Sequence, residues 1–150
     1  MPANTRAARL DAGPEAVWSV LADYGGIGSW SSDVDHSTMI SGLAAGVGAR
    51  RRIQVGRLTI IERVTEWGPE STLAYDIEGL PLPKAIRAVV NRWVLVGAGD
   101  TTVVEITTTV DTGSSRLAGG LGRAIARRLA RTSDHMLDDL AAVVATGSAG

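Results

Sequence analysis

The stretch PEAVWSVLADYGGIGSW, residues 14–30, contains a helix, its end and a change of direction. A proline and a glutamate open it, as is favoured in the first turn of a helix. Val17, Trp18 and Leu21 follow at helical spacing, which predicts an amphipathic helix over residues 14–24. The glycines beyond it predict the end of that helix. One further short turn is expected before the tryptophan that closes the stretch.

Strand signals flank this stretch on both sides. A short strand is expected over residues 4–10, and about six more are expected between the short turn and residue 111. Their signals are β-branched residues, alternation of apolar and polar positions, and punctuation by Gly and Pro. In the clearest of them, Leu73, Tyr75 and Ile77 face one side. Consecutive strands of this kind are typical of an antiparallel meander.

The last third of the chain changes to helical periodicity and predicts one long helix from about residue 115 to residue 145. Its arginines precede its aspartates, which we interpret as a solvated face. The closing residues 147–150 are expected to form a disordered tail, so the predicted single domain spans residues 1–146. The predicted apolar stripe comprises Leu117, Leu121, Ile125, Leu129, Met136, Leu137, Leu140 and Val143 or Val144.

Composition excludes several classes of function. The chain has 150 residues, enough for one domain with its own core, and no cysteine, which excludes disulfides, thiolate catalysis and cysteine-based zinc sites. A net charge of −1 argues against nucleic-acid binding, and the basic run at residues 50–52 is interpreted as a solvated strand end. His36 and His135 lie far apart and fit no metal-ligand spacing. We therefore expect no metal and no cofactor.

Neither a signal peptide nor an uncharged apolar run of about 20 residues is found in the sequence. We expect a cytoplasmic protein without stable membrane insertion. Of its 15 basic residues only Lys84 is a lysine, a bias that indicates a GC-rich coding genome. We also expect a bacterial source.

The order of strand, helix, short helix, six strands and long helix resembles the helix-grip fold of the polyketide cyclase/START-like (SRPBCC) superfamily. That superfamily includes the birch-pollen-allergen type, START lipid-transfer domains and plant abscisic acid receptors. The landmarks are PEAVWSVLADYGGIGSW, GVGARRRIQV, IERVTEW, LAYDIEG and the long final helix. The resemblance implies an α+β fold in which a curved antiparallel sheet of about seven strands wraps around the C-terminal helix. Two short helices follow the first strand, and a cavity for an apolar ligand lies between sheet and helix.

Alternation and the resemblance together give a set of expected ligand-binding residues, although the apolar ones would equally fill a dry core. Arg51 and Arg87 would hold a ligand carboxylate or enolate, or form ion pairs at the sheet rim. Trp30 would form a wall or lid at the cavity rim. The set comprises Trp30, Arg51, Ile53, Val55, Ile60, Leu73, Ile77, Arg87 and Met136.

Two glutamates match cavity-facing positions of the abscisic acid receptors. Glu62 would face the cavity, or would pair with Arg63 or Arg51 at the sheet surface. Glu105 matches the second position, but the alternation of its own strand turns it toward solvent, and we favour the alternation. A buried glutamate without a compensating arginine could act as general acid or base, so Glu62 and Tyr75 are the candidate catalytic residues.

The chain also departs from those receptors. Asp35 stands at the position of their anchoring lysine, which argues against binding of an abscisic-acid-like acid, and residues 56–58 replace a longer mobile gate. The loop at residues 79–86 is retained, and its Leu80 and Leu82 would cover a pocket mouth or simply connect two strands.

Three functions are consistent with these residues. The first is binding or carriage of a small apolar ligand such as a lipid, isoprenoid or polyketide. The second is a polyketide aromatase/cyclase or dehydratase that uses a cavity carboxylate. The third is an interaction module that uses the basic face of the last helix at a membrane or an acidic partner. The sequence leaves the oligomeric state open.

Overall fold

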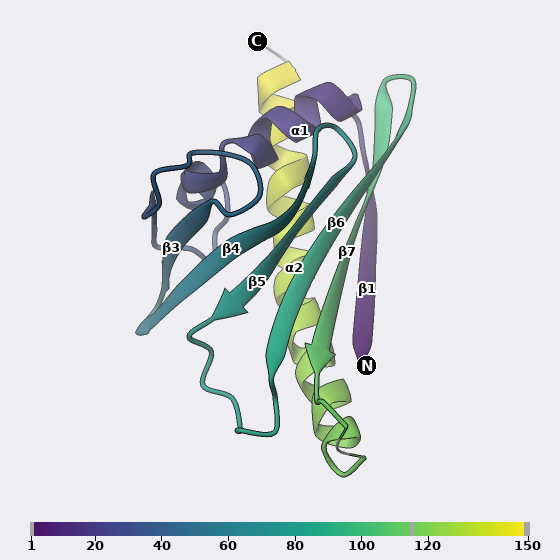
Figure 1. The fold of residues 1–150 in the computed structure, drawn as a ribbon. Coiled ribbons are helices and arrows are strands. Elements are labelled where there is room, and N and C mark those ends of the chain that lie inside the picture. The colour runs from purple at the N-terminus through teal and green to yellow at the C-terminus, as the bar shows by residue number, and fades with distance from the viewer. Residues whose placement is uncertain (1, 115, 149–150) are drawn as a thin grey trace.

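The computed structural model describes residues 2–114 and 116–148, which form a curved sheet with a long helix along one face (Figure 1). The predicted helix-grip fold is confirmed. The elements are β1 (Ala3–Leu10), α1 (Pro14–Ala22), η1 (Tyr24–Ser29), β2 (His36–Met39), β3 (Arg50–Val55), β4 (Leu58–Gly68), β5 (Thr72–Glu78), β6 (Ala88–Ala98), β7 (Thr101–Asp111) and α2 (Ala118–Ser148).

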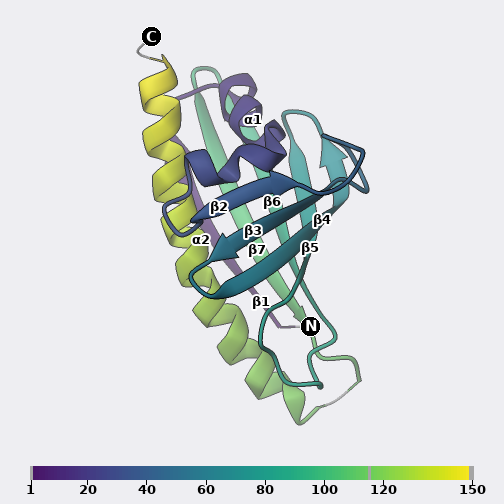
Figure 2. The same cartoon turned by 90° about the vertical axis from the view of Figure 1, so that its left-hand side faces the viewer.

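The sheet has the strand order β1-β7-β6-β5-β4-β3-β2, and every neighbouring pair is antiparallel. Strands β2 to β7 form the predicted meander, and β1 pairs with β7 at the far edge. Strands β1, β6 and β7 run along α2, whereas β2, β3 and β4 cross it at a steep angle (Figure 2). A register shift between Val64 and Glu66 adds to the bend of β4. This curvature leaves room between β3–β5 and the helix.

The glycines after α1 have a different role from the predicted one. Helix α1 ends at Ala22, and the glycines lie inside η1, a 3-10 helix that packs on β2. The backbone N–H of Gly28 donates to Ser37 Oγ at 2.8 Å, and that hydroxyl donates to the Gly25 carbonyl at 2.7 Å. A Cβ on Gly28 would lie only 2.8 Å from Ser37 Oγ. These glycines therefore permit close contact between two elements and do not terminate the helix.

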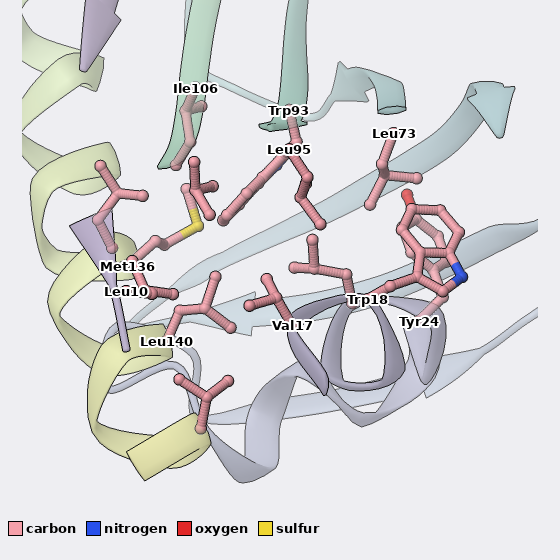
Figure 3. Close-up of a cluster of buried hydrophobic side chains, with 14 of the residues drawn as sticks. Leu10, Val17, Trp18, Tyr24, Leu73, Trp93, Leu95, Ile106, Met136 and Leu140 are labelled. Carbon is pink, nitrogen blue, oxygen red and sulfur yellow. The ribbon is translucent and has the colours of Figure 1, made fainter. Parts of the chain in front are cut away.

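The main core lies where α1, α2 and the sheet meet, and its side chains converge on one centre (Figure 3). Trp93 from β6 and Val17 from α1 are fully buried there, together with Leu140 from α2. Ring contacts extend the core, since Trp18 packs edge-on against Trp67 with ring centroids 5.1 Å apart. The core thus occupies one half of the space between sheet and helix.

The first half of α2 corrects the predicted apolar stripe. Leu117 lies in the turn before α2 and is 97% exposed, and Leu121 on the first turn of α2 is 41% exposed, so neither belongs to the core. Small residues face the sheet there instead, among them Ala126 and Ala130, because the helix approaches the sheet closely. At its other end α2 reaches Ser148, so the predicted tail from residue 147 is wrong for its first two residues. Residues 149–150 of that tail lie outside the described residues.

Candidate functional site: an apolar cavity with a polar floor

A cavity of about 330 Å³ lies between β3–β5, the loop after η1 and the middle of α2. Branched apolar side chains form most of its walls, and polar groups lie at two places. Its floor contains Glu62, Tyr75 and Asn91, all of them buried. Its mouth is marked by the exposed side chains of Arg131 and His135 on α2. The apolar walls come from Ile27, Val34, Ile53, Val55, Leu58, Ile60, Ile77, Leu80, Leu129 and Met136.

Of the nine residues predicted to bind ligand, five line this cavity: Ile53, Val55, Ile60, Ile77 and Met136. The two candidate catalytic residues, Glu62 and Tyr75, line it as well. Strand alternation identifies Ile53, Val55, Tyr75 and Ile77 because the concave face of the sheet is also the cavity face. Met136 was predicted from the helical stripe and Glu62 from the resemblance.

The other four predicted residues lie elsewhere. Trp30 packs edge-on against Trp93 with ring centroids 6.5 Å apart, and it borders a separate void of about 10 Å³ together with Arg51 and Leu73. Arg87 is exposed in the connection before β6 and lies against Gly113. Arg51 and Arg87 do not come together, because β4 and β5 lie between β3 and the start of β6 in the sheet.

Glu62 forms a buried ion pair with Arg51, its direct cross-strand neighbour. The Nε and Nη2 atoms of Arg51 lie 2.8 and 2.7 Å from Oε1 of Glu62. Nη1 donates to the Tyr24 carbonyl at 2.9 Å. The guanidinium carbon lies 3.8 Å from the ring centroid of Tyr24 and 4.9 Å from that of Tyr75. Of the two partners predicted for Glu62 the structure selects Arg51, because register places Arg63 opposite Arg50 instead.

The electrostatics of this cluster follow from its burial. Burial alone lowers the pKa of Arg51, but the carboxylate of Glu62 opposes this and the net shift of the Arg51 pKa is upward. Burial raises the pKa of Tyr75, and the negative charge of Glu62 adds to that rise. Burial likewise raises the pKa of Tyr24, which Arg51 offsets only in part. Both phenols are therefore neutral at physiological pH, and Tyr75 accepts a hydrogen bond from Trp93 Nε1 at 3.1 Å.

One polar atom of the floor has no hydrogen bond within the described part of the chain. Both contacts that Arg51 makes with Glu62 go to Oε1, and Oε2 has no hydrogen-bond partner among the described residues. Asn91 is already engaged, since Thr108 donates to its Oδ1 at 2.7 Å and its side chain also hydrogen-bonds to Tyr75. The floor can therefore accept a hydrogen bond from a bound molecule through Glu62.

The mouth is closed on one side by the loop after η1, which is fastened to α2. Asp33 Oδ2 lies 3.1 Å from His135 Nδ1, and Asp139 accepts two hydrogen bonds of 2.7 Å from the N–H and hydroxyl of Ser32. The Ser31 hydroxyl is buried at this wall without a partner in the described part of the chain. Sequence reasoning missed these residues because their partners lie about 100 positions away in the chain.

Other positions discussed from the sequence fall outside the cavity. Glu105 is exposed, as strand alternation predicts, while Val104 and Ile106 beside it are buried. Asp35 accepts a hydrogen bond from the Gly56 N–H at 2.9 Å and thereby ties the turn between β3 and β4. In the β5–β6 connection Leu80 lines the cavity, whereas Leu82 packs on the cluster around Val89 and Val110.

Within residues 2–114 and 116–148, no group of three or more histidine and carboxylate side chains is arranged to hold a metal ion.

Comparison with known proteins agrees with this architecture. The chain resembles a protein from Nitrosospira multiformis with 23% identity and a TM-score of 0.76, over 99% of this chain and 100% of that one. It resembles the Zhui aromatase/cyclase from Streptomyces sp. R1128 with 17% identity and a TM-score of 0.73, over 95% of this chain and 92% of that one. A START superfamily protein from Mycobacterium smegmatis matches with 13% identity and a TM-score of 0.74, over 96% and 97% of the two chains.

The sequence identities are low, so the likeness to these solved structures shows the fold and no more. No curated protein matches the chain. The profile of a family described as polyketide cyclase/dehydrase and lipid transport matches residues 1–145. The chain therefore belongs to the polyketide cyclase/dehydrase and lipid transport family.

Proposed function

We propose that this protein binds and carries a small apolar ligand, such as a lipid, isoprenoid or polyketide, in the cavity between sheet and α2. The observation that carries the proposal is the cavity itself, about 330 Å³ with predominantly aliphatic walls. Sites for small molecules are typically apolar hollows of roughly this size with a few placed polar groups. Membership of a family described by cyclase, dehydrase and lipid-transport functions supports the same conclusion.

The ligand would contact Ile53, Val55, Ile60, Ile77 and Met136, which come from three strands and α2. These aliphatic side chains form no hydrogen bonds with a ligand. They therefore select a ligand by its shape and by the apolar surface area that it buries. A cytoplasmic location, a bacterial source and the absence of nucleic-acid binding stay predictions from the sequence.

The ion pair of Glu62 and the protonated phenol of Tyr75 in the cavity floor favour carriage over catalysis. The ion pair with Arg51 makes Glu62 a hydrogen-bond acceptor, and the raised pKa of Tyr75 keeps its phenol protonated, so the phenol is not available as a general base. A second proposal, an aromatase/cyclase or dehydratase, is supported by Oε2 of Glu62, which could take a proton from a bound polyketide. That proposal expects Glu62→Gln to abolish turnover of a polyketide-like substrate while the fold is retained.

Filling the cavity tests the carrier proposal directly. We expect N-phenyl-1-naphthylamine, a neutral dye that fluoresces when it leaves water, to bind the wild-type protein saturably. Ile77→Trp places a large ring in the cavity and should remove that binding. Val96→Trp is the matched control, since Val96 is 59% exposed on β6 and does not line the cavity.

Circular dichroism and thermal melts would confirm that both variants are folded. Should Ile77→Trp prove unstable, Ile60→Phe makes the same test with a smaller increase in volume. Equal dye binding by the wild type and a folded cavity-filling variant would place the dye outside the cavity and contradict the proposal.

A further inference from the structure

The first half of α2 and the residues before it carry positive charge only. Residues 112–133 contain no aspartate or glutamate, although the whole chain has a net charge of −1. Five arginines lie in this segment, and all five are exposed. They are Arg116, Arg123, Arg127, Arg128 and Arg131. The charge is therefore local to one surface and does not reflect the overall composition.

Nothing in the described part of the chain neutralises these arginines, because none of the five forms an ion pair there. Other arginines do find carboxylates: Arg6 pairs with Asp134, and Arg92 pairs with Glu66. Arg123, Arg127 and Arg131 are spaced by four residues, which aligns them along the exposed side of the helix. At 1.5 Å per residue, the helical part of the row, from Arg123 to Arg131, is roughly 12 Å long, and Arg116 precedes it in the turn before α2.

Two large apolar side chains accompany this row. Leu117, in the turn before α2, is 97% exposed, and Leu121, on the first turn of α2, is 41% exposed. The sheet-facing positions of this half are taken by small residues such as Ala126 and Ala130, so the leucines have no core to enter. Exposed leucines beside a row of arginines are the pattern of a helix that lies in a membrane interface.

This surface is continuous with the cavity mouth. Leu129, Arg131 and Thr132 line the cavity directly after the arginine-rich turns. The β5–β6 connection lies at the same end of the molecule as the start of α2 in both views (Figures 1 and 2). Leu80 and Leu82 of that connection belong to the same apolar cluster as Leu129. A surface contacted by this half of α2 would therefore lie close to the entrance of the cavity.

We propose that the five arginines together with Leu117 and Leu121, here called the basic helix face, dock the protein reversibly on an anionic lipid bilayer. The occupant is a bilayer because the charge is spread along an extended row and the leucines protrude singly, without a shaped pocket for a protein side chain. Docking is peripheral, since among the described residues no helix is long and apolar enough to cross a membrane. Its purpose, exchange of an apolar ligand between bilayer and cavity, rests on the proposed function, whereas the docking surface does not.

Vesicle sedimentation tests this surface. The wild-type protein should bind vesicles of phosphatidylcholine containing about 30 mol% phosphatidylglycerol, should bind pure phosphatidylcholine vesicles far more weakly, and should dissociate as salt is raised. Arg127→Ala/Arg128→Ala should weaken binding to the anionic vesicles about 30-fold, from the contribution of each basic residue near such a surface. Leu117→Ser/Leu121→Ser should weaken it at least about tenfold with the charge unchanged.

Arg50→Ala/Arg52→Ala is the matched control. It removes two exposed arginines from β3, with the same change in net charge, and should leave vesicle binding within about twofold of wild type. Equal losses in the two arginine pairs would overturn the proposal in favour of general attraction by charge. Absence of wild-type binding to the anionic vesicles would overturn it too, and would turn the search toward an acidic protein partner.

The dye assay separates this inference from the proposed function. Arg127 and Arg128 do not line the cavity, so their double variant should bind N-phenyl-1-naphthylamine like the wild type. Dye binding without vesicle binding leaves the carrier function standing and overturns the docking surface. Vesicle binding without dye binding supports the docking surface and contradicts the carrier function.

Discussion

At the scale of single residues, the Arg51–Glu62 pair explains how an ionic group is tolerated beside an apolar cavity. Arg51 is 3% exposed, but its guanidinium is bound by Glu62, by a backbone carbonyl and by two aromatic faces. Removal of one partner from a buried pair typically costs about 3–5 kcal/mol, because the other charge is left uncompensated. The pair therefore holds β3, β4 and η1 in one geometry, which is also the geometry of the cavity floor.

The two tyrosines of the chain, Tyr24 and Tyr75, provide a prediction about pH. Burial raises the pKa of each above the ordinary tyrosine value of about 10. The folded state thus holds the phenolic protons more tightly than the unfolded state, so stability is complete below about pH 10 and falls as pH rises further. We expect no tyrosinate absorbance from the native protein at about pH 11, and absorbance from both residues once urea unfolds it.

Tyr75→Phe provides the control for that titration, since it should halve the absorbance gained on unfolding. A tyrosinate signal with a midpoint near the ordinary value of about 10 in the folded protein would show that at least one ring is hydrated.

Residue-scale predictions from the sequence succeeded where a strand's own alternation decides the outcome. Alternation alone places Glu105 outside, against the resemblance. It also puts Arg51 on the side of Ile53, and that side is buried, so the interpretation of residues 50–52 as a solvated strand end is wrong for Arg51. It could not choose between Arg51 and Arg63 as the partner of Glu62, because register between strands depends on the fold. Alternation also could not predict the position of Trp30, because Trp30 does not lie in a strand. Its ring packs on Trp93, which belongs to a strand far away in the sequence.

At the scale of elements, η1 and β2 form a unit on which one wall of the cavity depends. Gly28→Ala would bring a Cβ within 2.8 Å of Ser37 Oγ, which cannot retreat because it is hydrogen-bonded to both Gly28 and Gly25. We expect this variant to lose about 1–3 kcal/mol in urea unfolding, the usual cost of overpacking. It should also weaken dye binding, because the adjacent Ile27 lines the cavity.

Gly25→Ala is the matched comparison. The new Cβ there meets the flexible side chain of Met39, which can rotate away, so its loss should be clearly smaller. Equal losses for the two variants would mean that the backbone conformation of η1, and not its contact with β2, requires glycine.

Most elements were predictable from the sequence because their periodicity is local. The six strands after η1 and the long helix follow from alternation and from the stripe that includes Met136 and Leu140. The fastening of residues 31–34 to α2 was not predictable, because Asp33 and His135 meet only after the whole sheet has formed. The exposure of Leu117 was missed because the predicted helix began too early: Leu117 lies in the turn before α2 and not in the helical stripe.

At the scale of the whole molecule, the order of elements along the sequence predicts the fold. The sequence does not predict whether the space between sheet and helix is an open cavity or a core filled by side chains. Strand alternation predicts which side chains face inward, but it does not predict the distance between the sheet and α2. That separation is set by the curvature of β3–β5 across α2, a property of the assembled sheet. The space of about 330 Å³ therefore becomes visible only in the folded structure.

The cavity also predicts how the molecule responds to its ligand. A ligand that binds only the folded state stabilises it by mass action, about 2.7 kcal/mol at a concentration 100 times Kd. For a chain of 150 residues this corresponds to a rise in Tm of roughly 5–10 °C. We expect N-phenyl-1-naphthylamine to produce such a rise in the wild type and in Val96→Trp, but none in Ile77→Trp, by differential scanning calorimetry. Since dye on the outer surface would shift all three proteins alike, a rise in Ile77→Trp would show that the stabilisation does not come from the cavity.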